Sequence, residues 1–146
     1  QGKNMQIIKS KAFTVQVPTG RYVLGDPCYS VADEHWDALL ASCDYFNEPV
    51  GTVNGVKVLA FSTKWGDGYY QDQFGNEYGV DAGLIGLVPI SLATKKDDPD
   101  GLIVDFIGSV ICSTDGNGKL TFGKYVIDNI DTWYKRVYIN GEQGNL

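Results

Sequence analysis

Apolar and polar residues alternate with a period of two along much of the chain, and short turn sequences interrupt the alternation. In the segment from Ala12 to Val17, the phenylalanine and the two valines fall on one face, and the threonine and the glutamine fall on the other. This period is typical of a β-strand with one buried face. Runs of the same kind predict further strands at residues 21–24, 56–63, 69–74, 77–81, 84–92, 102–112, 120–127 and 132–139.

Two of the turn sequences predict β-hairpins. Asn54-Gly55 lies between short β-type runs, and this dipeptide favours the two-residue turn in which both residues have positive φ. Asp115-Gly116-Asn117-Gly118 lies between two longer runs in the same way. Strands joined by such short connections pair in opposite directions, so the pattern predicts an antiparallel sheet.

One segment has the spacing of a helix instead. The apolar residues that share its helical face are Trp36, Leu39, Leu40 and Cys43. Ser30 is a candidate N-cap, with Asp33 three residues later, and the helix is predicted from Val31 or Ala32 to Cys43.

These elements predict a mainly β, β-rich α+β fold, in which an antiparallel sheet curls into a sandwich or half-barrel with one short helix. A chain of 146 residues without an internal repeat or a linker is expected to form one domain, over residues 5–140. Residues 1–4 are interpreted as the remnant of a tag cleavage site, and residues 141–146 as a frayed C-terminus.

The composition narrows the function classes. A formal net charge of -6 argues against a protein that binds the phosphate backbone of nucleic acids, because such binding depends on Lys and Arg. The three cysteines are widely spaced and form no CxxC, so neither a disulfide framework nor a structural zinc site is expected. Without a run of about 18 apolar residues or a signal-peptide pattern, no membrane association is expected, and the predicted location is the cytoplasm.

The first candidate site is the corner Gly25-Asp26-Pro27, where a predicted strand ends, together with Cys28 and Tyr29. A carboxylate on a rigid turn beside a tyrosine is suited to ligand binding. The same residues also fit a structural role, because an aspartate before proline often accepts hydrogen bonds from the amides of its own turn. The sequence leaves both alternatives open.

The second candidate site is the stretch from Ser62 to Tyr70. It gathers Thr63, Trp65, Asp67 and Tyr69, which together offer a hydroxyl, two aromatic rings and a carboxylate flanked by glycines. Such a set suits a small polar ligand, since aromatic faces stack on the ligand and polar groups orient it. The alternative is an ordinary tight turn whose aromatic side chains cover the sheet.

Other chemistries have weaker support. Cys28 could act as a nucleophile only with His35, the single histidine, as its base, and no motif marks a third orienting residue. The tripeptide Asp81-Ala82-Gly83 has a weak likeness to the aspartic-protease signature. The chain has no GxxxxGK[ST], GxGxxG, HExxH or GxSxG motif, so no cofactor and no metal are predicted.

The two candidate sites together resemble a family of small uncharacterised proteins from bacteria and their phages. In this family a strand leads to Gly-Asp-Pro-Cys-Tyr, here Gly25 to Tyr29, and Phe-Ser-Thr-x-x-Gly-Asp-Gly-x-Tyr follows, here Phe61 to Tyr70. This chain departs from the family after Tyr70, where members often continue with Pro-Val-Tyr. The resemblance implies no particular activity, but it implies a phage or prophage accessory protein and a site shared by Asp26 and Asp67.

The sequence therefore predicts a small intracellular binding protein rather than an enzyme, which captures or blocks a host component. Its binding residues are predicted to be Asp26, Tyr29, Thr63, Trp65, Asp67 and Tyr69. The expected partner is a small polar ligand or a host protein, and the chain could form a homo-oligomer. The alternative is a small hydrolase, with or without a metal, that uses Asp26 and Asp67 as an acid–base pair.

Overall fold

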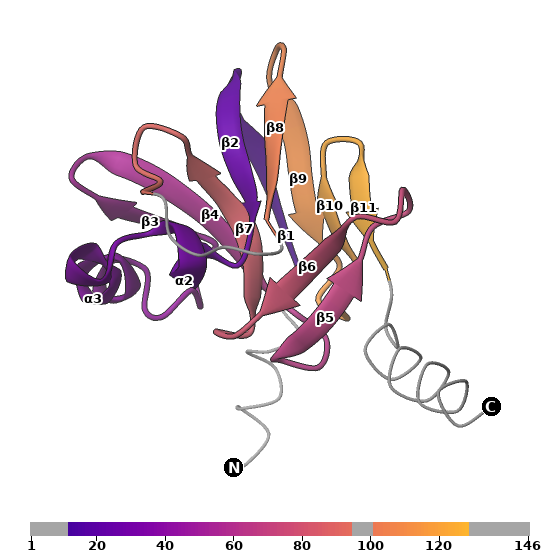
Figure 1. Ribbon diagram of the computed structural model, residues 1–146, viewed down its shortest axis with the longest axis horizontal. Helices are drawn as coiled ribbons and strands as arrows, with labels where there is room; N and C mark the ends of the chain where they lie inside the picture. Colours follow the sequence, from indigo (N-terminus) through magenta and orange to yellow (C-terminus); the bar gives the residue numbers. More distant parts are fainter. Residues whose placement is uncertain (1–11, 95–100, 129–146) are drawn as a thin grey trace.

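The computed structural model describes residues 12–94 and 101–128, and these form a mainly β structure with antiparallel sheets (Figure 1). The interpretations of residues 1–4 and 141–146 and the strand predicted at 132–139 lie outside the described residues. Within the described ranges no helix is long and apolar enough to cross a membrane.

Most elements lie between the turn signals of the sequence, but the strands predicted at 69–74 and 84–92 end earlier, at Gln71 and Pro89. The first strands and the helices are β1 (Phe13–Val17), β2 (Gly20–Gly25), α2 (Pro27–Ser30), α3 (Asp33–Ser42), β3 (Val50–Val53) and β4 (Val56–Ser62). The remaining strands are β5 (Gly68–Gln71), β6 (Glu77–Val80), β7 (Leu84–Pro89), β8 (Leu102–Phe106), β9 (Val110–Thr114), β10 (Leu120–Phe122) and β11 (Tyr125–Ile127).

In the part of the chain that is described, the strands form three antiparallel sheets that are not closed into a barrel. The larger sheet has five strands in the order β3-β4-β7-β2-β8, and a second has four in the order β1-β9-β10-β11. Strands β5 and β6 pair with each other, with Tyr69 opposite Gly79. The prediction of a mainly β fold with curled antiparallel sheets is confirmed.

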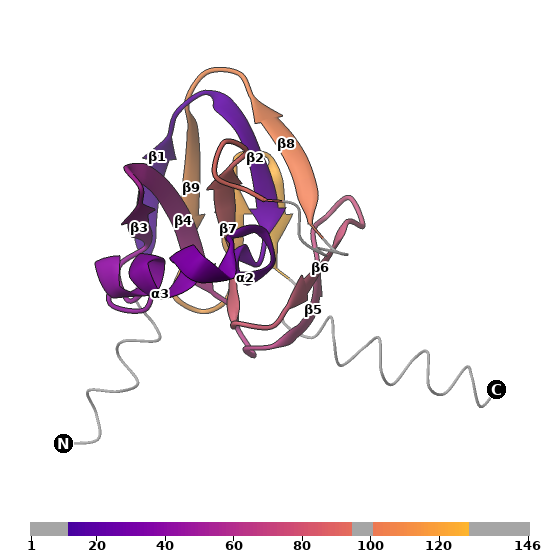
Figure 2. The ribbon, with the colours of Figure 1, turned by 60° about the vertical axis from the view of Figure 1, so that its left-hand side comes forward.

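The five-stranded sheet is buried on both faces at its centre. Alternate residues of β4 separate into two cores, with Leu59 and Phe61 in the core that includes residues of the four-stranded sheet, and Val58 and Ala60 in the core shared with the helices. Figure 2 shows α2 and α3 lying together along one side of this sheet. Such double burial explains why β7 reads as a nearly continuous apolar run.

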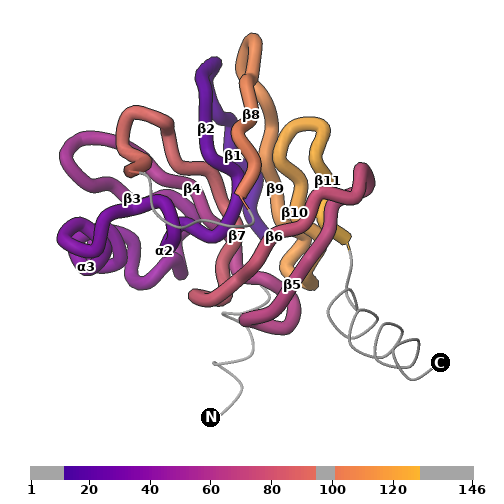
Figure 3. The backbone as a smooth tube through the Cα atoms, viewed as in Figure 1, coloured from indigo at the N-terminus to yellow at the C-terminus, as the bar shows by residue number. Residues whose placement is uncertain are grey.

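A bent two-stranded ribbon joins the two larger sheets. Strand β1 continues into β2 through Pro18 and Thr19, while β8 continues into β9, and β1 pairs with β9 as β2 pairs with β8. Figure 3 shows the two bends side by side at one end of the molecule. The single strand predicted at 102–112 is therefore wrong. Gly108, with φ of 79°, breaks it, and the chain passes from one sheet to the other.

The two predicted hairpin turns are present. Asn54 and Gly55 have φ of 52° and 76°, as a two-residue hairpin turn of this type requires, and they join β3 to β4. The turn of residues 115–119 joins β9 to β10. The single strand predicted at 120–127 is wrong, because Gly123, with φ of 63°, turns the chain between β10 and β11.

The helical region contains two helices within the described residues, where the sequence predicted one. Pro27–Ser30 forms the additional short helix α2, because proline suits the first helical position and Asp26 caps it. Ser30 is therefore not the N-cap of α3, which begins after Ala32 without a side-chain cap. The predicted apolar face is correct, since Leu39 and Cys43 are buried in the core shared with the sheet.

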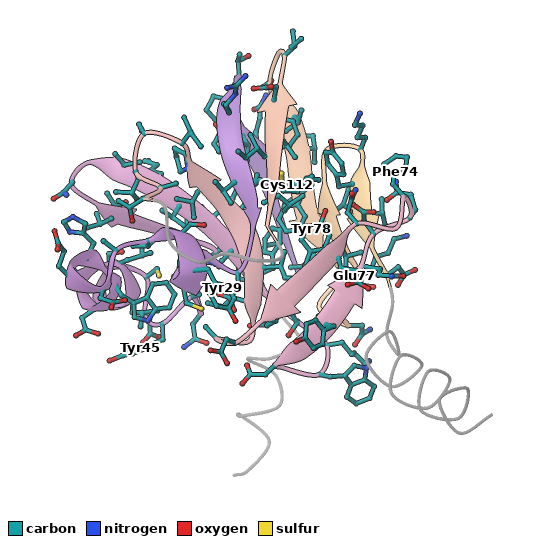
Figure 4. The ribbon with its side chains drawn as sticks, viewed as in Figure 1. Tyr29, Tyr45, Phe74, Glu77, Tyr78 and Cys112 are labelled. Atoms are coloured by element: carbon teal, nitrogen blue, oxygen red, sulfur yellow. The ribbon has the colours of Figure 1, made fainter. Side chains whose placement is uncertain are left out.

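The chain leaves α3 through an unusual left-handed segment. Asp44, Tyr45 and Phe46 have φ of 53°, 58° and 61°, a region that non-glycine residues rarely occupy. Phe46 is buried at the end of this segment, whereas Tyr45 is exposed and points away from the sheet (Figure 4). Burial of the Phe46 ring offsets the strain of the turn.

The buried thiol of Cys112 is expected to make the protein less stable as the pH becomes alkaline. Burial raises the pKa of the Cys112 thiol from 9.0 to about 11, so the folded state holds the proton more tightly than the unfolded state. This contribution is fully present below pH 9 and is lost as the pH rises through the folded pKa. Between these limits we expect the free energy of unfolding to fall by roughly 2 to 3 kcal/mol.

Urea denaturation at a series of pH values measures this loss. The Cys112→Ala variant should lose part of the alkaline decline, because alanine has no proton to release. Val110→Ala, on the same strand, removes apolar volume without removing a titrating group and should keep the wild-type decline. An equal pH dependence in Cys112→Ala and the wild type would contradict the assignment.

Candidate binding surface

The Asp26 carboxylate is buried and fully engaged with the backbone. Its Oδ1 accepts a hydrogen bond from the amide of Cys28 at 3.0 Å, which caps α2. Its Oδ2 accepts from the amides of Asp81 and Ala82 at 2.8 and 2.7 Å. The Asp26 side chain is 1% exposed. It therefore fastens the start of α2 to the turn between β6 and β7.

This geometry is that of the structural alternative considered for Asp26. An acid–base role would require the carboxylate to give up amide hydrogen bonds in a buried site, which leaves donors unsatisfied. Aspartate is the residue that fits here, because an ionised carboxylate accepts hydrogen bonds only and these amides only donate. The position of Asp26 therefore favours positioning of the turn over catalysis.

The second candidate stretch includes the loop of residues 63–67 between β4 and β5, which we call the Trp65 loop. Hydroxyl groups hold this loop from inside. Thr63 Oγ1 donates a hydrogen bond to the carbonyl oxygen of Gly66 at 2.7 Å. Tyr70 Oη donates to the same oxygen at 2.9 Å and accepts from the amide of Trp65 at 3.0 Å. Since Tyr70 is buried, it ties the loop to the core.

The side chains that this loop leaves outside are aromatic and acidic. Trp65 is 60% exposed and Tyr69, on β5, is 40% exposed. Asp67 lies between them in sequence and is exposed. The ammonium group of Lys64 lies over the Trp65 ring, 5.6 Å from its centroid, at the distance of a cation–π contact. The predicted residues Trp65, Asp67 and Tyr69 are thus all accessible.

Both candidate stretches are attached to the turn between β6 and β7. Asp26 binds the amides of Asp81 and Ala82, and the amide of Thr63 donates to the carbonyl oxygen of Gly83 at 3.0 Å. A Cβ atom added at Gly83 would lie 3.8 Å from the Gly66 Cα, so this turn and the Trp65 loop are in contact. The corner of Asp26 and the Trp65 loop are therefore neighbours in the fold through this shared turn.

The turn between β9 and β10 supports the Trp65 loop from another direction. A Cβ atom added at Gly118 would lie 2.6 Å from the Lys64 Cβ, which leaves no room for a side chain there. Gly118 also has φ of 102°, a conformation that favours glycine. The segment from Asp115 to Gly118 therefore forms a hairpin turn and also packs against the Lys64 side chain.

A buried cluster around Asp72 orders the loop between β5 and β6. Asp72 Oδ1 accepts from the amides of Phe74 and Asn76 at 2.8 and 3.0 Å. Its Oδ2 accepts from Asn76 Nδ2 and from the Tyr78 hydroxyl at 2.8 and 2.7 Å. Burial, followed by the hydrogen bond to Asp72, raises the pKa of Tyr78, so this phenol remains a donor. Our sequence analysis assigned no role to Asp72 or Tyr78.

This loop presents a second exposed aromatic group. Phe74 is 59% exposed and lies at the end of the loop (Figure 4). Its ring packs edge-on against that of Tyr125, with the ring centroids 5.9 Å apart. Lys124 lies over both rings, 6.0 Å from the centroid of Phe74 and 5.4 Å from that of Tyr125. The Gln73 side chain bonds the backbone of Lys124 and Val126, which attaches the loop to β11.

The remaining candidates lie on the two helices. Tyr29 and Cys28 lie half-buried on α2. His35 lies in the first turn of α3, with its Nε2 atom 3.6 Å from Glu34 Oε2 and 3.5 Å from Asn54 Nδ2. Among residues 12–94 and 101–128, no group of three His, Cys, Asp or Glu side chains is placed to hold a metal ion.

Comparison with known proteins gives no match to a family model, to a curated protein or to a solved structure. The likeness to the bacterial and phage family therefore stays a prediction from the two motifs, and the functional argument depends on the geometry of this chain.

Proposed function

We propose that the protein is a non-enzymatic binding protein whose partner surface is formed by Trp65, Asp67 and Tyr69. The observation that carries this proposal is an exposed indole on a loop that is held rigid from inside by Thr63 and Tyr70. Large aromatic residues dominate the binding energy of many interfaces. A loop that is already ordered loses little conformational entropy on binding.

The predicted site residues have two different roles, and this difference supports the same proposal. The side chains of Asp26 and Thr63 form hydrogen bonds with the backbone, whereas Trp65 and Tyr69 expose large parts of their side chains to solvent. Internal residues thus shape the loop, and the outer residues Trp65 and Tyr69 are 60% and 40% exposed. The phage or prophage setting implied by the two motifs suggests a host component of a bacterial cell as that partner.

The test is a capture experiment from a bacterial lysate with the wild-type protein and with Trp65→Ala. We expect Trp65→Ala to weaken retention of the partner at least about tenfold, as for a central aromatic contact, with the melting temperature within about 2 °C of the wild type. Tyr45→Ala is the matched control, because Tyr45 is 71% exposed but lies outside this surface. Equal retention by wild type and Trp65→Ala would contradict the proposal.

A further inference from the structure

We propose that the Trp65 surface recognises a cationic side chain, an arginine or lysine of a peptide or protein partner. This inference rests on the proposed function and names the chemistry of the partner. The charged head of that side chain would lie against the exposed rings of Trp65 and Tyr69, with the carboxylates of Asp67 and Asp81 beside it.

Next to the exposed rings lie two carboxylates that form no ion pair with any described residue. Asp67 belongs to the Trp65 loop and Asp81 to the turn between β6 and β7, and both are exposed. These two segments touch, since the Thr63 amide bonds the Gly83 carbonyl oxygen at 3.0 Å. Among the described residues, Arg21 forms an ion pair with Asp105 and the His35 ring lies 3.6 Å from Glu34, and neither contact includes Asp67 or Asp81.

The Trp65 ring already has a cation beside it, the ammonium group of Lys64. The Lys64 ammonium lies 5.6 Å from the centroid of the Trp65 ring. Indole is the side chain that attracts a cation most strongly through its ring face. Lys64 thus shows that a positive group can reach this ring, and it would compete with a cation supplied by the partner.

The charge of the whole molecule supports the same inference. A net charge of -6 attracts cationic partners at long range and slows the approach of anionic ones. An anionic ligand would also meet the carboxylates of Asp67 and Asp81 beside the rings. A neutral saccharide could stack on Trp65 and Tyr69 and donate hydroxyl hydrogen bonds to the carboxylates, but it carries no positive charge to balance theirs. The charges therefore favour a cationic peptide segment.

The experiment titrates the full chain with a blocked pentapeptide, Gly-Arg-Gly-Arg-Gly, and follows the indole N–H signal of Trp65 by NMR. Trp65→Phe assigns that signal. We expect a saturable shift, about fivefold to tenfold weaker binding in the Asp67→Asn/Asp81→Asn double variant, and weaker binding at higher salt. Asp37→Asn, an exposed carboxylate on α3, is the matched control and should leave the affinity unchanged.

The Lys64→Met variant predicts the direction in which the affinity for the peptide changes. Removing the competing ammonium should tighten binding of the arginine peptide about twofold to fivefold. For an anionic or neutral partner the same change would weaken binding or leave it unchanged. The corresponding glutamate peptide should cause no saturable shift.

The inference is overturned if the arginine peptide causes no saturable shift, if its binding ignores the two carboxylates, or if Lys64→Met weakens it. A shift caused by cellopentaose and not by the arginine peptide would replace it with a saccharide site, and the Trp65 surface would stand. If no probe binds and the lysate capture shows no dependence on Trp65, the proposed function fails as well.

Discussion

Replacing Asp26 by asparagine should lower the free energy of unfolding by about 2 to 4 kcal/mol, because the new amide group would direct a donor at donors. In the folded protein Oδ2 accepts from the amides of both Asp81 and Ala82. An asparagine can satisfy either these amides or that of Cys28 with its one oxygen, but not both sets. Since Asp26 is 1% exposed, water cannot easily replace the lost acceptor.

Urea denaturation compared between Asp26→Asn and Asp67→Asn is the matched measurement. Both changes remove one negative charge, but Asp67 is exposed, so its replacement should change stability by less than about 0.5 kcal/mol. The effects on binding should be reversed: Asp67→Asn should weaken the affinity for the partner and leave the fold intact. If Asp26→Asn were as stable as Asp67→Asn, the cap would have no energetic importance, and an acid–base role for Asp26 would regain support.

Replacing Asp72 by alanine should lower the free energy of unfolding by about 3 to 4 kcal/mol, since it leaves one buried and three part-buried donors without their acceptor. The donors are the amides of Phe74 and Asn76, the Asn76 side chain and the Tyr78 hydroxyl. Tyr78 is 0% exposed, so its hydroxyl has no route to water in the folded state. The loop that carries Phe74 should loosen together with the fold.

Tyr78→Phe separates the parts of this cluster. It removes one hydrogen bond and leaves Asp72 bound to Phe74 and Asn76, so it should cost only about 1 to 2 kcal/mol. Asp37→Ala, on the exposed side of α3, is the control for the loss of a carboxylate and should change stability by less than about 0.5 kcal/mol. Equal stability of Asp72→Ala and Asp37→Ala would show that the cluster is not a structural centre.

Local patterns predicted the parts of this protein that depend on local chemistry. The alternation in β1 and the Asn54-Gly55 turn appear as expected, because side-chain direction in a strand and positive φ in a tight turn are fixed over a few residues. The apolar face of α3 was correct for the same reason. The exposure of Trp65 and Tyr69 was also compatible with the binding site predicted from the sequence.

One error arose where the chain passes from one sheet to another. Residues 102–112 carry β-type residues throughout, yet Gly108 lets β8 end in one sheet and β9 begin in another. The short helix α2 was missed although its signals are local, with Asp26 as its cap and Pro27 in its first turn. A glycine within an apolar run was the available signal for the first error.

By itself the sequence determined the strand and helix periods, the tight turns and the chemical groups near residues 26–29 and 62–70. Tertiary structure alone decided the use of each group. Asp26 and Asp67 both follow or lie between turn residues, but only Asp26 meets amides from the turn between β6 and β7. Burial and long-range hydrogen bonds assign these roles, because they depend on which strands lie side by side and not on neighbours along the chain.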